Sequence, residues 1–199
     1  LEVEGLVQGV GFRPTVHRLT TQLGLSGFIR NTSQGAELEL EGQPDQVAQF
    51  VPLLQQQAPV LARIRRVSTV SIPPTGETGF HILPSVGETL PDTQVSPDVG
   101  ICEDCLREMR DPKDRRYRHP FLNCTNCGPR FTIVQSVPYD RERTAMGVFP
   151  MCEHCQGEYT DITDRRYHAQ PTCCPNCGPT LTYLDGAGQA VEGDSIRLA

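Results

Sequence analysis

The chain has 199 residues, of which 37% are hydrophobic, and a formal net charge of −6 at neutral pH. This length allows one or two ordinary domains, and the acidic balance argues against a nucleic-acid-binding protein, which needs a basic surface. No apolar run approaches the ~18 residues of a membrane helix, and no signal peptide is visible. We therefore expect no membrane partner and a cytoplasmic location, and the start at Leu1 suggests a piece of a longer protein.

The first part of the chain, residues 1–87, contains no cysteine and is predicted to form a domain with its own core. Apolar residues at helical spacing predict two helices, over 14–24 and 44–57. Alternating or apolar stretches predict strands at 1–7, 27–31, 36–41, 64–72 and 80–83. The resulting order, βαββαβ, is that of the ferredoxin-like sandwich, an α+β fold.

A glycine-rich loop, GLVQGVGFR at residues 5–13, joins the first strand to the first helix. Glycines at such a junction let backbone N–H groups turn inward and bind an anion, and the helix N-terminus assists. Arg13 adds a guanidinium suited to phosphate, although a tight turn with a surface arginine explains these residues equally well. Asn31, at the end of the next strand, is placed to orient a water, with ordinary turn chemistry as the alternative.

All nine cysteines lie beyond a polar segment at 88–100, which is predicted to be a linker. Eight of them form four C-x2-C pairs, and a shift of 50 residues superimposes the first two pairs on the last two. The same shift repeats the sequence Asp-Arg-Arg-Tyr, at 114–117 and 164–167. The repeat predicts a duplicated module with copies at 101–150 and 151–180, followed by a truncated further domain at 181–199.

Each copy reads C-x2-C-x18-C-x2-C, which is the spacing of a four-cysteine zinc site. Two thiolates on one tight turn point at one metal, and two such turns supply a closed tetrahedral shell. We therefore predict two structural Zn²⁺ ions with ligands paired within each copy; interleaved pairing, an iron–sulfur cluster and a redox dithiol are the alternatives. The predicted ligands are Cys102, Cys105, Cys124 and Cys127 in the first copy, and Cys152, Cys155, Cys174 and Cys177 in the second.

The remaining polar residues of the cysteine region have plainer explanations. Cys173 stands where the first copy has Asn123, and is predicted to be a bystander. His119, His154 and His168 are predicted to lie at the surface or behind the ligands, since each site already has four cysteines. The repeated Asp-Arg-Arg-Tyr is predicted to be a solvated turn with a packed tyrosine and a local ion pair, the alternative being an anion-binding or partner-binding patch.

In combination, the loop and the cysteine modules resemble a known family. Residues 5–13 with Asn31 resemble the acylphosphatase signature with its catalytic arginine and asparagine. The segments CTNCGPRFT at 124–132, PYDR at 138–141 and DRRYHAQP at 164–171 narrow the resemblance. Together they resemble the N-terminal part of the HypF family, the carbamoyltransferases of [NiFe]-hydrogenase maturation, and the resemblance covers essentially the whole chain.

The resemblance implies a catalytic role for Arg13 and Asn31. It implies phosphate binding by the loop residues Gln8, Gly9, Val10, Gly11, Phe12 and Arg13. The family uses carbamoyl phosphate in an ATP-dependent reaction and passes the carbamoyl group to a cysteine of the partner HypE, where it becomes a cyanide ligand.

The resemblance also bounds what this chain performs. Residues 181–199 are expected to begin the family's YrdC-like domain, so no ATP binding and only the first, hydrolytic step are expected here. A broad-specificity acylphosphatase is one alternative. The other is a zinc-dependent interaction module whose acylphosphatase-like domain is inactive.

Overall fold

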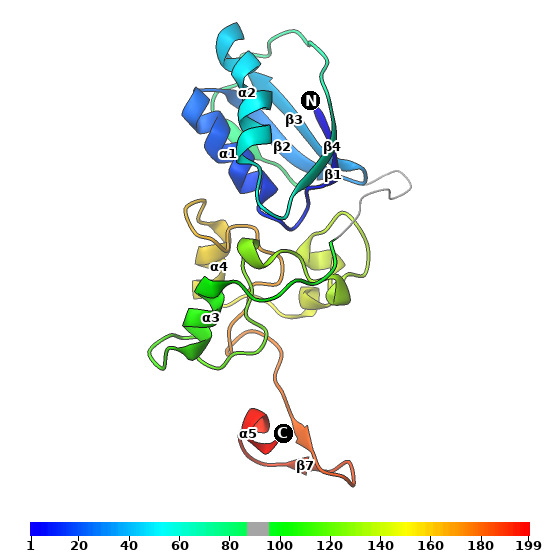
Figure 1. Ribbon diagram of the computed structural model, residues 1–199, viewed down its shortest axis with the longest axis vertical. Helices are drawn as coiled ribbons and strands as arrows, with labels where there is room; N and C mark the ends of the chain where they lie inside the picture. The colour runs from blue at the N-terminus through cyan, green and yellow to red at the C-terminus, as the bar shows by residue number, and fades with distance from the viewer. Residues whose placement is uncertain (87–95) are drawn as a thin grey trace.

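The computed structural model describes residues 1–86 and 96–199, which form a sheet domain, a cysteine-rich domain and a short C-terminal hairpin (Figure 1). Most of the predicted linker 88–100 falls on residues 87–95, which lie outside the described residues. Within the described ranges, no helix combines the length and the apolar character that a membrane crossing requires.

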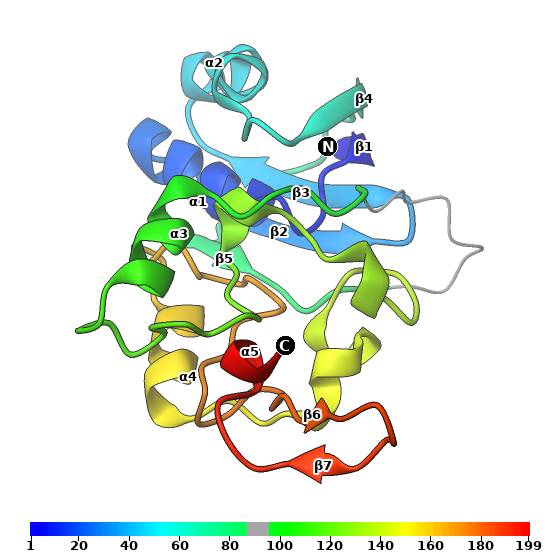
Figure 2. The same ribbon diagram turned by 60° about the horizontal axis from the view of Figure 1, so that its bottom comes forward.

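The first domain is a five-stranded sheet with two helices packed on one face (Figures 1 and 2). The strand order is β4-β1-β3-β2-β5, with β5 parallel to β2 and the other neighbours antiparallel. The elements are β1 (Glu2–Leu6), α1 (Phe12–Leu23), β2 (Ser26–Thr32), β3 (Gly35–Glu41), α2 (Pro44–Gln57), β4 (Arg63–Ser68) and β5 (Phe80–Ile82). This arrangement confirms the predicted ferredoxin-like sandwich, with β5 added at the edge beside β2.

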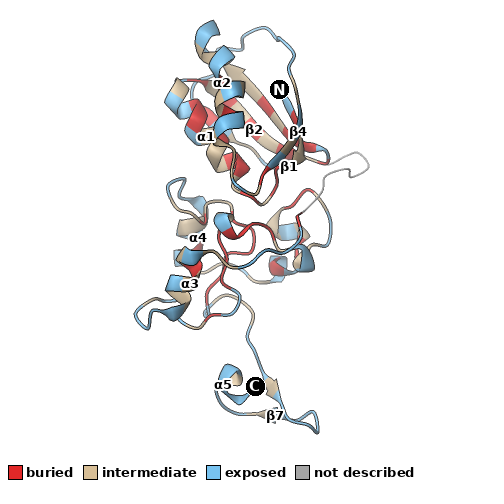
Figure 3. Ribbon diagram, in the orientation of Figure 1, coloured by how far each residue is buried: buried red, intermediate tan, exposed pale blue. Residues whose placement is uncertain are grey.

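The core of this domain lies between the helices and the inner face of the sheet (Figure 3). In β3, Leu38 is fully buried and Leu40 packs against the core, while the glutamates that alternate with them point to the other face, as the alternation predicts. The remaining core includes Val16 and Leu19 of α1, Ile29 of β2, and Phe50 and Leu54 of α2. The apolar core of this domain therefore contains no cysteine.

Two element boundaries differ from the prediction by more than one residue. Helix α1 begins at Phe12, so Phe12 and Arg13 belong to its first turn and not to the preceding loop. The fourth strand ends at Ser68 and not at residue 72. Ser68 pairs with Glu2, the first residue of β1, and the pairing of these two strands ends there.

The cysteine-rich domain contains little regular structure and repeats its backbone geometry at the 50-residue offset. Helices α3 (Glu103–Arg110) and α4 (Glu153–Thr160) each begin directly after the first cysteine of their copy. Arg118 and His168, 50 residues apart, both adopt the left-handed conformation with φ of 57° and 53°, which is uncommon outside glycine. Beyond the second copy follow β6 (Tyr183–Leu184), β7 (Ala190–Val191) and α5 (Ser195–Leu198).

Candidate functional site

The loop between β1 and α1 is shaped by glycines where it meets the helix. Gly9 and Gly11 have left-handed φ values of 69° and 78°, and Gly11 is the N-cap of α1 without a side-chain cap. The side chains of Val10 and Phe12 are buried in the core, so these two residues offer only their backbone to a ligand. The first N–H groups of a helix have no partner within the helix, so this uncapped helix start is suited to bind an anion.

Arg13 lies in the first turn of α1, and its side chain is only 8% exposed. Its guanidinium lies 3.7 Å from the carboxylate of Asp140, a residue of the cysteine-rich domain. This distance is too long for a hydrogen bond. Across residues 1–86 and 96–199, the Arg13 guanidinium has this ion pair but makes no hydrogen bond, so its N–H donors remain available to an anionic ligand.

Asn31 lies near the end of β2, on the same side of the strand as the core residue Ile29. It is 1% exposed, and neither atom of its side-chain amide has a hydrogen-bond partner in the described structure. Buried polar atoms are nearly always paired, so an unpaired amide at this place indicates a position for a polar ligand or water.

Gln8 fastens the loop both to the sheet and to the cysteine-rich domain. Its buried amide nitrogen donates to the carbonyl of Thr32 at 2.8 Å and to that of Gly35 at 2.9 Å. Its amide oxygen accepts from the backbone N–H of Tyr139 at 2.7 Å. Because Thr32 follows Asn31 directly, Gln8 holds the loop beside the end of β2. Both N–H donors of its side-chain amide are used in these bonds, so the side chain has no donor left for an anion.

The cysteine-rich domain packs directly on this loop. A Cβ atom added to Gly9 would lie 2.7 Å from the Pro129 side chain and 2.8 Å from the ring of Tyr139, so only glycine fits there. The turn of the second copy also lies within electrostatic range of Arg13. Burial, with a smaller contribution from the charge of Arg13, lowers the pKa of His168 to about 4.

The predicted metal ligands form two clusters, one within each copy. In each cluster the four sulfur atoms lie within 4.8 Å of one another, and all the cysteines are free thiols. The Sγ–Sγ distances are 3.6 Å for Cys102–Cys124, 3.8 Å for Cys124–Cys127, 3.8 Å for Cys152–Cys174, 3.7 Å for Cys174–Cys177 and 3.6 Å for Cys155–Cys177. Sulfur atoms placed tetrahedrally at about 2.3 Å from zinc would be about 3.8 Å apart, so the clusters fit that ion.

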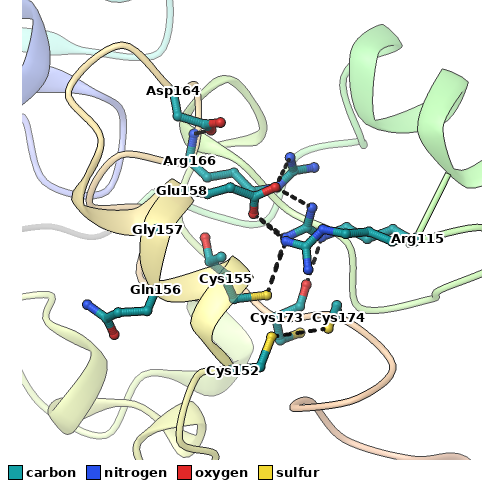
Figure 4. Close-up of polar contacts among 12 residues, drawn as sticks. Arg115, Cys152, Cys155, Gln156, Gly157, Glu158, Asp164, Arg166, Cys173 and Cys174 are labelled. Carbon is teal, nitrogen blue, oxygen red and sulfur yellow. Dashed lines mark hydrogen bonds and ion pairs between the residues drawn. The ribbon is translucent and has the colours of Figure 1, made fainter.

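Arginines of the first copy reach the metal cluster of the second copy (Figure 4). Arg116 donates to the Glu158 carboxylate at 2.9 Å, to the Cys155 sulfur at 3.4 Å and to the carbonyl of Cys173 at 2.9 Å. Arg115 donates to the same carboxylate at 2.7 Å. Burial opposes the ionisation of Glu158, but the bonds from the two arginines prevail and lower the pKa of its carboxyl to about 2.

The second copy returns these contacts at the equivalent positions. Arg166 forms an ion pair with Glu108 and donates to the carbonyl of Asn123 at 3.2 Å. Arg165 pairs with Glu108 as well and donates to the Cys105 sulfur at 2.9 Å. The two copies are therefore joined by a reciprocal set of arginine contacts.

These contacts correct the prediction for the repeated Asp-Arg-Arg-Tyr. Arg116 and Arg166 are 2% and 3% exposed, and each forms its shortest ion pair with a carboxylate of the other copy, although Arg166 also lies 3.7 Å from Glu158 of its own copy. Tyr117, which was expected to pack, is 43% exposed. The sequence shows that the module is repeated, but it does not show that the two copies pack against each other.

The histidines and the ninth cysteine lie outside both clusters, in the described chain. His154 is exposed, whereas His119 is buried with its Nε2 atom 3.3 Å from the sulfur of Cys173. His168 packs against the rings of Tyr159 and Tyr167, at centroid distances of 5.0 and 4.6 Å. Cys173 therefore lies against His119 of the first copy and is not a member of the second cluster.

Sequence reasoning missed Tyr139 and Asp140 as parts of the site. They belong to the segment 130–150, which separates the two cysteine clusters and so falls outside the repeated part of the copies. Two signals were available: the sequence PYDR at 138–141, which contributes to the resemblance, and the lack of a counterpart in the second copy, since a segment between two equivalent metal sites has a role other than ligating the metal.

Comparison with known proteins first defines the class of the chain. Residues 1–82 match the acylphosphatase family, and residues 101–134 and 151–184 match the HypF finger. An acylphosphatase of Yersinia pseudotuberculosis is 38% identical over 81 residues, which cover 40% of this chain and 88% of that protein. The chain thus joins an acylphosphatase domain to a duplicated four-cysteine finger.

Longer matches define the particular family. The carbamoyltransferase HypF of Synechocystis is 42% identical over 149 residues, which cover 75% of this chain and 19% of that protein. A crystal structure of full-length HypF in its phosphate- and nucleotide-bound form matches with a TM-score of 0.90 and 45% identity, covering 98% of this chain and 26% of that one. The chain belongs to the HypF family, and it spans about a fifth of the length of the curated HypF relatives that it matches.

Proposed function

We propose that this chain is part of a carbamoyltransferase for [NiFe]-hydrogenase maturation, and that its acylphosphatase domain hydrolyses carbamoyl phosphate. The observation that carries the proposal is the state of Arg13 and Asn31, whose buried side chains make no hydrogen bond within the described structure. Such groups fit an anion and a water, because buried polar groups are otherwise paired. Membership of the HypF family supports the carbamoyl substrate.

In this proposal the loop binds the phosphate and Arg13 stabilises its charge. Backbone N–H groups of Gln8, Gly9, Val10, Gly11 and Phe12 would donate to the phosphate oxygens, and the guanidinium of Arg13 would neutralise the phosphoryl group in the transition state. Phosphoryl transfer depends mainly on positioning and electrostatics, so no covalent nucleophile is required.

Asn31 would hold the attacking water in line with the leaving group. The water oxygen forms a bond to phosphorus while the bond from phosphorus to the acyl oxygen breaks. Carbamate leaves as an anion, and inorganic phosphate keeps one oxygen of the water while a proton is released. The carbamate oxygen is a good leaving group, so a strong general acid is unnecessary.

The two cysteine clusters would each hold one structural zinc ion. Four thiolates per site close the coordination shell and leave no position for a substrate, so the metal would contribute stability and not chemistry. The ligands would be the four cysteines of each cluster, and Cys173 would not take part.

The remaining steps would belong to parts of the protein beyond this chain. We propose that ATP use and transfer of the carbamoyl group to HypE lie there, and that residues 181–199 begin the next domain, of YrdC type. The division into an acylphosphatase domain at 1–87, a linker at 88–100, and cysteine modules at 101–150 and 151–180 is part of the same proposal. Free, metal-binding thiols favour a reducing compartment, which supports a cytoplasmic location.

The decisive experiment measures phosphate release from carbamoyl phosphate by the zinc-loaded chain and its variants. We expect Arg13→Ala to lower kcat/KM by roughly 10²–10³-fold, as for loss of a principal charge clamp, and to weaken inhibition by phosphate. Asn31→Ala should lower kcat more than it weakens phosphate inhibition. One matched control is Arg18→Ala, which removes an exposed arginine of the same helix. The other is Gln34→Ala, which removes an exposed amide in the turn between β2 and β3.

The same experiment separates the alternatives. Comparable kcat/KM values for carbamoyl, acetyl and benzoyl phosphate would indicate a broad-specificity acylphosphatase. A parent chain that releases no phosphate from any of them would indicate an interaction module with an inactive domain.

A further inference from the structure

The carboxylate of Asp140 is the feature of the site that phosphate binding alone does not explain. It lies 3.7 Å from the guanidinium of Arg13, the residue proposed to bind phosphate. A carboxylate beside an anion site repels every phosphate ester alike, and the repulsion is larger where water is excluded. We therefore look for a favourable interaction of the Asp140 carboxylate that offsets this repulsion.

Asp140 is also held rigidly in this position. The preceding residue, Tyr139, is fully buried and donates its backbone N–H to Gln8 of the loop at 2.7 Å. The following residue, Arg141, donates from its side chain to the carbonyl of Gln170 at 2.7 Å. The carboxylate is therefore carried by a segment anchored on both sides, and it is presented to the loop by the cysteine-rich domain.

A fixed acceptor beside a phosphate site can distinguish one acyl phosphate from another. Carbamoyl and acetyl phosphate have nearly the same size and shape, and differ in that an NH₂ group replaces a methyl group. Pocket size cannot separate such a pair strongly, whereas a hydrogen bond to the N–H can. A carboxylate has only acceptors, so it matches the NH₂ group and is left without a partner by the methyl group.

We propose that Asp140 is a specificity-determining residue, whose carboxylate accepts a hydrogen bond from the N–H of a carbamoyl group while Arg13 holds the phosphate. This inference rests on the proposed acyl phosphate hydrolysis at Arg13 and Asn31. It assigns to the cysteine-rich domain a direct part in substrate choice, in addition to its metal sites. The repulsion between the Asp140 carboxylate and the phosphate is then offset when the acyl group donates an N–H hydrogen bond to that carboxylate.

The test compares kcat/KM for carbamoyl and acetyl phosphate in the zinc-loaded chain and in Asp140→Ala. We expect the ratio of the two values to fall by about 10- to 100-fold, the usual effect of a hydrogen bond to a charged group, mainly through loss of carbamoyl phosphate turnover. Inhibition by inorganic phosphate should become stronger, since a repulsive charge is removed. The matched control is Asp104→Ala, since Asp104 is an exposed aspartate that forms a local ion pair with Arg107 in the same domain.

The other outcomes are equally informative. An equal fall for both substrates would show that Asp140 only positions Arg13, and an unchanged ratio would also overturn the inference. If Asp140→Ala loses zinc or melts early, Asp140→Asn decides, because it keeps the size of the side chain and should lower the ratio less but in the same direction. A parent chain that hydrolyses neither substrate would contradict the proposed hydrolysis itself, before Asp140 is considered.

Discussion

Arg116, in the first cysteine module, donates from its guanidinium to the carboxylate of Glu158 in the second module at 2.9 Å, and the equivalent Arg166 pairs with Glu108 in the opposite direction. Each arginine pair also contacts a ligand sulfur of the other module, Cys155 or Cys105. A zinc ion bound by four thiolates carries net negative charge, which these cations offset. The two metal sites are therefore linked, and neither module is complete by itself.

Loss of Arg116 should act on the module that does not contain it. We expect Arg116→Ala to destabilise the cysteine-rich domain by about 3 kcal/mol, the lower end of the range for breaking a buried pair, because Arg115 still contacts Glu158. Release of metal from the second cluster should be faster than from the first. Thermal unfolding and ¹¹³Cd NMR of the cadmium-substituted protein would measure both effects.

The control for this prediction is Arg107→Ala, since Arg107 is exposed and its ion pair with Asp104 is local. It should change stability by less than about 1 kcal/mol. Perturbation of the first cadmium resonance alone in Arg116→Ala would contradict the linkage between modules.

Cys173 and Cys174 are adjacent, yet they should respond differently to the same substitution. Cys174 belongs to the second cluster, whereas Cys173 packs against His119 outside it. We expect Cys173→Ser to retain two zinc ions per chain and Cys174→Ser to retain one. Metal analysis after gel filtration would measure this, and equal zinc loss in both variants would show that the 50-residue register is wrong.

Removal of zinc should unfold the cysteine-rich domain and leave the sheet domain folded. Binding free energy at a four-cysteine site is largely folding free energy, whereas the core around Ile29 and Leu38 contains no cysteine. Hydrogen exchange after chelation should show loss of protection in 101–180 and retained protection in β2 and β3. Concerted unfolding of both domains would contradict the independence of the two cores.

The periodic features of the fold were accessible from the sequence. Leu38 and Leu40 alternate with glutamates, and an alternation of this kind reports which face of a strand is buried. The cysteine spacing places four sulfurs around one point because two residues between ligands make a tight turn, and this depends on local geometry alone.

Features that depend on contacts between distant segments were not accessible. Arg116 and Arg166 are interpreted from the sequence as solvent-exposed, because a lone arginine carries no sign that its partner lies 42 or 58 residues away. In the same way, Asp140 lies 127 positions after Arg13, and only the packing of the two domains brings them together. The fourth strand ends at Ser68, where its pairing with β1 stops, and this limit is set by the neighbouring strand and not by the sequence of the strand itself.

His168 provides a test of how the second module faces the proposed site. Burial first, and then the charge of Arg13, lower the pKa of His168 to about 4, so the imidazole should stay neutral at pH 7. In the unfolded chain a histidine titrates near 6.5, and the unfolded state therefore binds more protons between these values. This contribution to stability should be complete above about pH 6.5 and be lost as the pH falls toward 4.

NMR titration of the imidazole separates the two causes. Arg13→Ala should raise the pKa of His168 but leave it below 6.5, because burial is the larger cause. Inorganic phosphate bound at Arg13 should raise it as well, by neutralising the same charge, and Arg18→Ala should leave it unchanged. A pKa near 6.5 in the parent would place His168 in solvent. A response to Arg18→Ala that equals the response to Arg13→Ala would show that His168 senses the charge of the whole helix and not the occupied site.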